Sequence, residues 1–299
     1  MRLSNLGEFG LIDRLSKVCL CSNSVVKGIG DDAAVVQGSG KKKMLFTTDM
    51  LLEDVHFTHK MPGFLIGKKA LACNISDIAA MGGIPKYAVI SLGISGKEDS
   101  HMIEEIYRGI SAMAKKFKVD VVGGDTVSAH KLIINIALTG EVLSREIVYR
   151  NGAKVGDKIF VTGQLGNSFK SGHHLTFTPR LAESQFLVKK YHPHSMIDIS
   201  DGLVSDLGHI LEQSKVGACL YEDQIPLRKG ARVGDAFKDG EDFELLFTVS
   251  AEKARYLRKV KKFPMYEIGE ILPLESGYFL QDDNSRREKL SALTGYRHF

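Results

Sequence analysis

Carboxylates recur along this chain beside glycines and hydroxyl side chains, an arrangement that can hold a hard metal ion. The first are the adjacent Asp31 and Asp32, in a glycine-rich stretch at residues 28–36. Adjacent carboxylates repel each other, and a divalent cation with oxygen ligands would neutralise them. Taken alone, such a pair more often marks a solvated turn. The metal interpretation is favoured because similar motifs recur at Thr47-Thr48-Asp49, Ile75-Ser76-Asp77, Gly123-Gly124-Asp125-Thr126, Asp198-Ile199-Ser200-Asp201-Gly202 and Gly240-Glu241-Asp242.

The ligand types in these motifs indicate which metal they favour and for what chemistry. Carboxylates and hydroxyls, without Cys or His at ligand spacing, favour Mg²⁺ or Mn²⁺ over Zn²⁺. An acidic site can hold a polyphosphate only through bridging cations, so phosphoryl transfer is the expected chemistry. Arg150 is the best placed basic residue to bind the remaining phosphate oxygens. Residues 63–69 resemble a P-loop, but one residue is missing between the glycines and Lys69 replaces the required Ser or Thr.

Hydrophobic periodicity predicts the elements that position these motifs. Strands at 33–36 and 44–48 are expected, and the second delivers Thr47 to Asp49 to its end. A helix at 64–81 holds Asp77 in an apolar stretch, where a carboxylate needs a cation partner. A buried strand at 119–122 leads into Gly123. Further strands are expected at 87–94, 132–138, 158–162, 242–249, 264–270 and 278–280, and further helices at 7–19, 100–117, 180–190 and from Gly202 to about 212.

Length and patterning predict two domains. The chain has 299 residues, of which 43% are hydrophobic, so it exceeds one average domain and has material for two cores. Strands alternate with helices in both halves, and Ile-Ser-Asp occurs at 75–77 and again at 199–201. We therefore predict an α/β fold of the α+β type, with domains at residues 1–145 and 146–299.

Charge, hydropathy and cysteine usage exclude several classes of protein. The net charge of +4 is spread along the chain without long basic blocks, which disfavours a nucleic-acid partner. No apolar run is long enough to span a membrane, and no export signal is visible. The four cysteines form no C-x-x-C pair, so we expect reduced, mostly buried thiols. A cytoplasmic protein is therefore expected.

Taken together, the motifs resemble the thiamine-monophosphate kinase family. The resemblance covers nearly the whole chain in order and spacing, and it rests on residues 30–34, 48–49, 74–82, 123–126, 150–153, 198–203 and 240–245. That family belongs to the aminoimidazole ribonucleotide synthetase-like superfamily. The resemblance therefore implies a two-domain architecture in which each half is a mixed sheet with packed helices, together with ATP use and homodimer formation.

The resemblance also implies an activity: ATP-dependent phosphorylation of thiamine phosphate to thiamine diphosphate, the last step in the synthesis of that compound, with several Mg²⁺ ions. The implied metal ligands are Asp32, Thr47, Thr48, Asp49, Asp77, Asp125, Asp198 and Asp201, with the chemistry assigned to Mg²⁺ held by Asp49, Asp77 and Asp125. The implied ATP contacts are Gly124, Asp125, Arg150, Ser200 and Tyr107. The implied thiamine phosphate contacts are His56, Glu241 and Tyr296, with Tyr296 stacking on the thiazolium ring.

No general base is expected, because the second pKa of a phosphomonoester is about 6 and the acceptor oxygen is already ionised near neutral pH. Clustered Mg²⁺ ions would remove the repulsion between the two polyanions and align them, so direct in-line transfer without a phosphoenzyme is expected. The chain departs from the family pattern between Gly166 and Pro179, where it is shorter, and at Thr47, where the family commonly has Ser.

Two alternatives to this activity stay open. One is another ATP-dependent synthetase of the superfamily, or a selenophosphate synthetase, although the latter would need a reactive Cys near a glycine-rich N-terminus. The other is a nucleotide-binding regulatory module without catalysis. Two of the implied contacts also have ordinary structural readings: His56 as a satisfied structural histidine and Tyr296 as a terminal packing residue.

Overall fold

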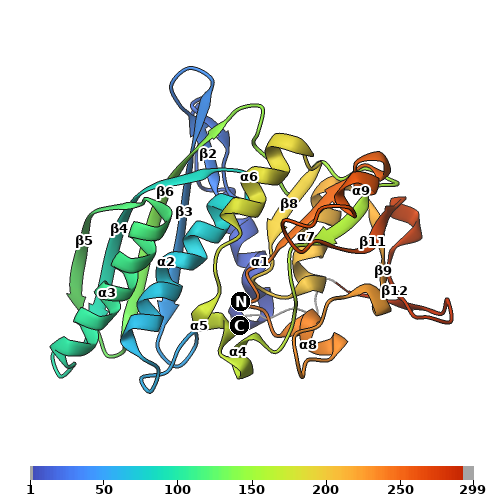
Figure 1. Ribbon diagram of the computed structural model, residues 1–299. Coiled ribbons are helices and arrows are strands. Elements are labelled where there is room, and N and C mark those ends of the chain that lie inside the picture. The colour runs from blue at the N-terminus through green and yellow to red at the C-terminus, as the bar shows by residue number, and fades with distance from the viewer. Residues whose placement is uncertain (1–2, 292–299) are drawn as a thin grey trace.

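The computed structural model describes residues 3–291 and contains two sheets with packed helices. Helix α2 (Gly63–Ala80) lies between them, because it contacts β3, β4 and β6 of the first half and β8, α5 and α6 of the second (Figure 1). Both sheets are mixed, and the predicted α/β architecture is confirmed. The first sheet ends at Leu143 and the second begins at Lys158, while the boundary at 145 stays a prediction.

The first sheet carries its helices on one face. Its strand order is β1 (Val25–Lys27), β2 (Ala34–Gln37), β3 (Lys42–Leu52), β6 (Ile133–Leu143), β4 (Ile84–Ile94) and β5 (Asp120–Ser128). Neighbouring strands are antiparallel except for the parallel pair β4 and β5. Figure 1 shows α2 and α3 (Ser100–Phe117) against the same side of this sheet.

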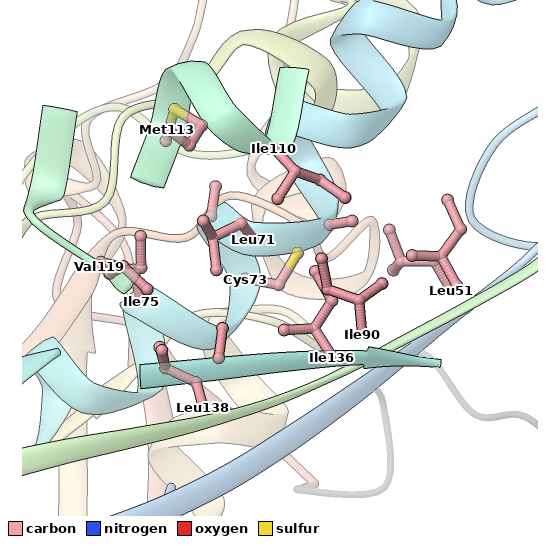
Figure 2. Packing of buried hydrophobic residues seen from close by; sticks show 14 of the residues in the cluster. Leu51, Leu71, Cys73, Ile75, Ile90, Ile110, Met113, Val119, Ile136 and Leu138 are labelled. Carbon is pink, nitrogen blue, oxygen red and sulfur yellow. The ribbon is translucent and has the colours of Figure 1, made fainter. Parts of the chain in front are cut away.

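The core of the first half forms where α2 and α3 meet the sheet. Leu71 of α2 and Ile110 of α3 are fully buried against Ile136 of β6 (Figure 2). The two helices approach closely at two glycines. A Cβ atom on Gly67 would lie 1.9 Å from the Ile106 carbonyl oxygen, so no larger residue fits there. This close packing fixes the position of α2, which carries Asp77.

The second sheet has the strand order β13 (Arg287–Lys289), β12 (Tyr278–Gln281), β9 (Gly217–Tyr221), β11 (Tyr266–Leu272), β7 (Lys158–Val161), β10 (Leu245–Val249) and β8 (Ser195–Asp198). Only β9 and β12 pair in parallel among its described strands. The helices of this half are α4 (Ser168–Ser171), α5 (His173–Thr176), α6 (Leu181–Lys190), α7 (Leu203–Ser214), α8 (Val233–Lys238) and α9 (Ala251–Leu257). Strand β8 ends at Asp198, and α7 begins directly after Gly202, so both flank the second Ile-Ser-Asp motif.

Several predictions about elements are wrong. Strand β5 is exposed along its whole length, although its apolar residues predicted a buried strand. Gly123 to Thr126 lie within β5, and Thr47 to Asp49 lie in the middle of β3, where strand ends were expected. Strand β10 starts at Leu245, three residues late. Strands β1, β8, β9 and β13 were not predicted, and all of them except β9 are too short for a clear alternation.

The N-terminal region also differs from its prediction. Helix α1 (Leu3–Ser16) ends before Cys19, and Ile12 and Leu15, which the pattern placed on its packing face, are exposed. Cys19 and Cys21 are exposed, which makes only two of the four free thiols buried. Among the helices in residues 3–291, none is long and apolar enough to cross a membrane.

Candidate active site

Three carboxylates from distant parts of the chain converge beneath the junction of the two halves. Asp32 precedes β2, Asp77 lies on α2, and Asp198 ends β8, yet a ligand oxygen of each lies within 4.8 Å of the others. Asp32 and Asp198 are almost fully buried. The structure thus brings together three of the predicted metal ligands.

The residues around this cluster leave a place for a cation. Arg150 bonds to only one oxygen of Asp32, with 2.6 Å between its Nη2 and Asp32 Oδ1. Ser76 Oγ donates to Asp198 Oδ2 at 2.5 Å, and Thr47 Oγ1 donates to Asp77. Asp32 Oδ2 is buried and has no hydrogen-bond partner among residues 3–291. An all-oxygen donor set with a bare buried carboxylate oxygen fits Mg²⁺.

Electrostatics within the cluster supports the same reading. Burial, followed by the negative charge of Asp49, raises the pKa of Asp77 well above its usual value. Burial and the charge of Asp32 raise the pKa of Asp198 to about 8. Burial raises the pKa of Asp49 to about 6. Ionising these buried carboxylates at the same time costs free energy, because their negative charges repel one another. A bound divalent ion would offset that cost.

A second acidic group lies at the start of α7. Oxygens of Asp201 and Asp206 and a ring nitrogen of His209 lie within 4.8 Å of one another. Asp206 Oδ2 accepts the backbone N–H groups of Asp201 and Gly202, both at 3.1 Å, and so holds this turn. Burial lowers the pKa of His209 to about 4. The sequence analysis did not select Asp206 and His209 as site residues. Their spacing of three residues places them on one face of α7, beside the turn that carries Asp201.

A cavity of about 380 Å³ opens between the two halves beside these groups. Thr48, Asp49 and His56 line it from the first half, and Ser200 and Glu241 from the second. Residues predicted to contact the metal, ATP and thiamine phosphate therefore line the same cavity. The further lining residues are Met50, Leu51, Val55, Cys73, Phe169, Asp201, Asp239 and Phe243.

A buried ion pair connects the two halves at the edge of this cavity. Lys69 of α2 is fully buried, and its Nζ donates to both carboxylate oxygens of Glu241, at 2.6 and 2.7 Å. The same Nζ donates to the backbone carbonyl of His56 at 2.7 Å. Lys69 thus fixes Glu241 and the backbone of His56 together. The sequence did not lead us to predict the partner of Lys69, although a lysine inside an otherwise apolar helix signals a buried partner.

Three predicted ATP contacts lie elsewhere in the chain. Gly124 and Asp125 are on β5, which β6 and β4 separate from β3, so about 14 Å of sheet lies between β5 and Thr48. Asp125 is in register with Ser91 of β4, which is in register with Asn135 of β6 and, through it, with Met50 of β3. Its side chain therefore lies on the same sheet face as Thr48, two residues before Met50. Tyr107 of α3 lies next to β5. Tyr296 lies outside the described residues.

Comparisons with known proteins agree with this arrangement. Residues 30–142 match the family described as AIR synthase related protein, N-terminal domain, and residues 124–279 match the corresponding C-terminal domain. The chain is 34% identical over 329 aligned positions to thiamine-monophosphate kinase of Aquifex aeolicus (strain VF5), covering 100% of both. Identity to thiamine-monophosphate kinase of Bacillus subtilis (strain 168) is 33%, covering 98% of this chain and 100% of that protein. A solved structure described as AaThiL complexed with AMPPCP and TMP superimposes with a TM-score of 0.86 at 34% identity, covering 100% of this chain and 99% of that one.

Proposed function

Because this chain belongs to the thiamine-monophosphate kinase family, we propose that it transfers the γ-phosphoryl group of ATP to thiamine phosphate in the cytoplasm and releases thiamine diphosphate, the last step in the synthesis of that compound. One observation carries this proposal. The cluster of Asp32, Asp77 and Asp198 lies beside a cavity that His56 and Glu241 line, and Asp49, which lines the same cavity, is close enough for its charge to raise the pKa of Asp77. The relative that binds AMPPCP and TMP supports the same pair of substrates.

The carboxylates of the cluster are the groups that would hold Mg²⁺. Asp32, Asp77 and Asp198 supply oxygens at its centre, and Asp49 lies against Asp77. Bound Mg²⁺ would supply positive charge that reduces the repulsion between two polyanionic substrates. Thr47, which donates to Asp77, keeps that carboxylate in one orientation. The remaining proposed ligands are Thr48, Asp125 and Asp201.

The chain's own residues position the reactants for direct in-line transfer. Arg150 is anchored on Asp32 and has further N–H groups for the phosphates of ATP. His56 Nδ1 accepts the backbone N–H of Leu52 at 3.0 Å, which fixes the ring at the cavity wall. The acceptor oxygen needs no base, since it is ionised near neutral pH. Catalysis then rests on alignment and charge neutralisation.

The first prediction tests the reaction and its metal. We expect ADP release with thiamine phosphate only when Mg²⁺ is present, and we expect Mg²⁺ alone to raise the melting temperature, since it binds the folded carboxylate cluster. A coupled ADP assay over a panel of phosphorylated acceptors, with calorimetry, measures both. Turnover with a different acceptor would identify another activity of the superfamily. ATP binding without turnover of any acceptor would identify a regulatory module.

We further propose that the active form is a homodimer joined through the outer face of the first sheet. This face, opposite α2 and α3, exposes Phe46, Met50, Tyr87 and Val89, each by 42% or more. Strand β5 beside them is exposed along its length. Soluble monomers rarely expose a contiguous apolar patch of this kind. A two-fold dimer covers the same face on both subunits.

Dimer formation also accounts for the distant ATP contacts. Asp125 lies on this outer face, too far along the sheet to reach Thr48 of its own chain. Two sheets packed face to face place β5 of one subunit over β3 of the other. We therefore propose that Gly124 and Asp125 complete the site of the second subunit. Tyr107 stays a proposed ATP contact, although α3 lies on the opposite face of the sheet.

The second prediction tests this exchange with mixed dimers. Asp77→Asn and Asp125→Asn homodimers should both be nearly inactive. A heterodimer of the two, purified through two different tags, should recover about half of the wild-type activity, because one of its two sites is then intact. Light scattering would measure whether the protein is a dimer in solution. An inactive heterodimer would show that Asp125 serves the site of its own subunit, and an active Asp125→Asn homodimer would show that it serves neither site.

A further inference from the structure

The segment at residues 166–177 contributes Phe169 to the cavity wall. It consists of α4 and α5, joined by Gly172 in the left-handed region at a φ of 75°. Phe169 of α4 lines the cavity and is 44% exposed. Phe169 is therefore a large apolar side chain that is partly exposed at the cavity.

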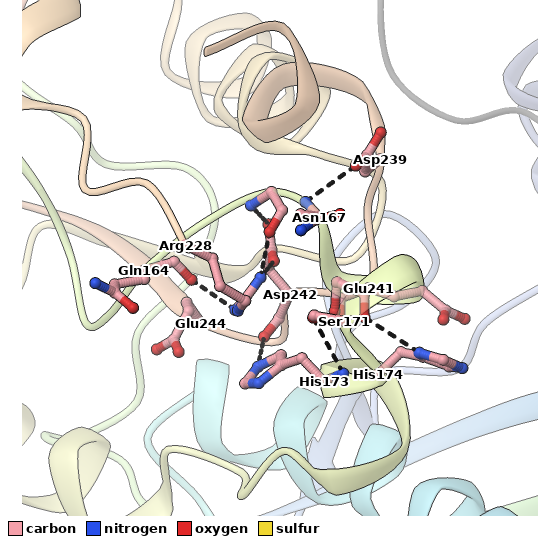
Figure 3. Close-up of polar contacts among 12 residues, drawn as sticks. Gln164, Asn167, Ser171, His173, His174, Arg228, Asp239, Glu241, Asp242 and Glu244 are labelled. Carbon is pink, nitrogen blue, oxygen red and sulfur yellow. Dashed lines mark hydrogen bonds and ion pairs between the residues drawn. The ribbon is translucent and has the colours of Figure 1, made fainter. Parts of the chain in front are cut away.

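Hydrogen bonds fix this wall to the loop that carries Glu241. The backbone N–H of Gly166 donates to Asp242 Oδ2 at 2.9 Å, and that of Asn167 donates to Asp239 Oδ2 at 3.0 Å (Figure 3). Ser168 Oγ donates to the carbonyl oxygen of Glu241 at 2.6 Å. Three successive residues are therefore anchored immediately before Phe169. The position of its ring relative to Glu241 follows from the local backbone and not from a mobile loop.

The Phe169 ring is also oriented from behind. It stacks on the imidazole of His174 with 4.2 Å between ring centroids and an interplanar angle of 12°. His174 is buried, and burial together with the charge of Lys69 lowers the pKa of His174 to about 4, so its ring is neutral near pH 7. One face of Phe169 therefore packs on a neutral ring. The other face is left for the cavity.

The charge of the cavity indicates what the free face contacts. Asp49, Asp201 and Asp239 line the cavity together with Glu241, whose charge Lys69 balances, whereas none of the lining residues in the described chain is Lys or Arg. Acidic groups beside an aromatic face favour a flat cationic ring, because the π-electrons attract positive charge. The phosphate end of the acceptor then points toward the carboxylate cluster, where Mg²⁺ would lie.

We propose that Phe169 contacts the cationic thiazolium ring of thiamine phosphate and makes the site selective for a positively charged acceptor. This inference rests on the proposed function. Phe169 acts here as a binding residue in addition to His56 and Glu241. It offers an aromatic contact within the described chain, independent of Tyr296.

The third prediction separates a cation–π contact from simple apolar packing. Phe169→Leu keeps apolar bulk but removes the aromatic face, so KM for thiamine phosphate should rise about 3- to 30-fold. Phe169→Tyr should change it little. KM for ATP and the melting temperature should stay at wild-type values, because the side chain is half exposed. Phe64→Leu is the matched control, since Phe64 is 37% exposed on α2 and does not line the cavity.

A neutral acceptor analogue, in which carbon replaces the charged ring nitrogen, completes the test. Its affinity, measured by calorimetry, should be nearly equal for the wild type and Phe169→Leu. If Phe169→Leu weakened the binding of the charged and the neutral ligand equally, Phe169 would be only an apolar wall. If it weakened the binding of neither, Phe169 would not belong to the acceptor site. The proposed function is judged separately, by turnover of thiamine phosphate in the wild type. If that fails, calorimetry of thiamine phosphate with the two proteins still decides the role of Phe169.

Discussion

Replacing Asp77 by Asn should lower the rate of phosphoryl transfer about a thousandfold and at the same time raise the melting temperature of the metal-free protein. Asp77 lies within 4.8 Å of carboxylate oxygens of Asp32 and Asp198, and its pKa is raised by burial and by their charges together with that of Asp49. Asn has the same shape without the charge. The substitution therefore removes repulsion in the metal-free state and a metal ligand in the active state.

Two measurements check this expectation. Steady-state kinetics at saturating substrates gives the loss in turnover, and thermal unfolding with EDTA or with Mg²⁺ gives the stability. The wild type should gain stability on addition of Mg²⁺, and Asp77→Asn should gain much less. Asp223→Asn is the matched control, because Asp223 is exposed in a turn of the second half. A lower melting temperature of metal-free Asp77→Asn would instead make Asp77 a structural residue that Thr47 holds.

The sequence was sufficient where a local pattern determined the structure. Helix α3 was predicted with the observed bounds, Ser100 to Phe117, because its apolar residues recur at helical spacing, and the structure adds that Asp99 caps its first turn. The need of Asp77 for a cation followed from its place among small apolar residues of α2. The convergence with Asp32 and Asp198 follows only from the packing of α2 between the two sheets.

The sequence was insufficient where burial or pairing depends on residues far away in the chain. Val121 and Val122 gave β5 the pattern of a buried strand, yet this strand is exposed, because an apolar run does not show what packs against it. Lys69 pairs with Glu241 across 172 residues, and no local motif indicates this. The role of Phe169 depends on the hydrogen bonds that anchor α4, which no spacing rule predicts.

Replacing Lys69 by Met should destabilise the protein by about 3–5 kcal/mol, because it leaves the Glu241 carboxylate without its cation in a largely buried site. Met has nearly the length of Lys, so the change in packing is small. Denaturant unfolding of the metal-free protein measures this loss. The double variant Lys69→Met/Glu241→Gln should recover most of the lost stability, since neither charge then remains.

The pH dependence of Lys69→Met gives an independent check. Burial already raises the pKa of Glu241 above its usual value, and without Lys69 this pKa rises further. A carboxyl with a raised folded pKa binds a proton more readily in the folded state, so its stabilising contribution is present at low pH and is lost as pH rises through the folded pKa. The deficit of Lys69→Met relative to the wild type should therefore shrink from pH 8 to pH 5. An equal deficit at both pH values, with no recovery in the double variant, would mean that Lys69 stabilises the fold through packing and that Glu241 is positioned by its backbone alone.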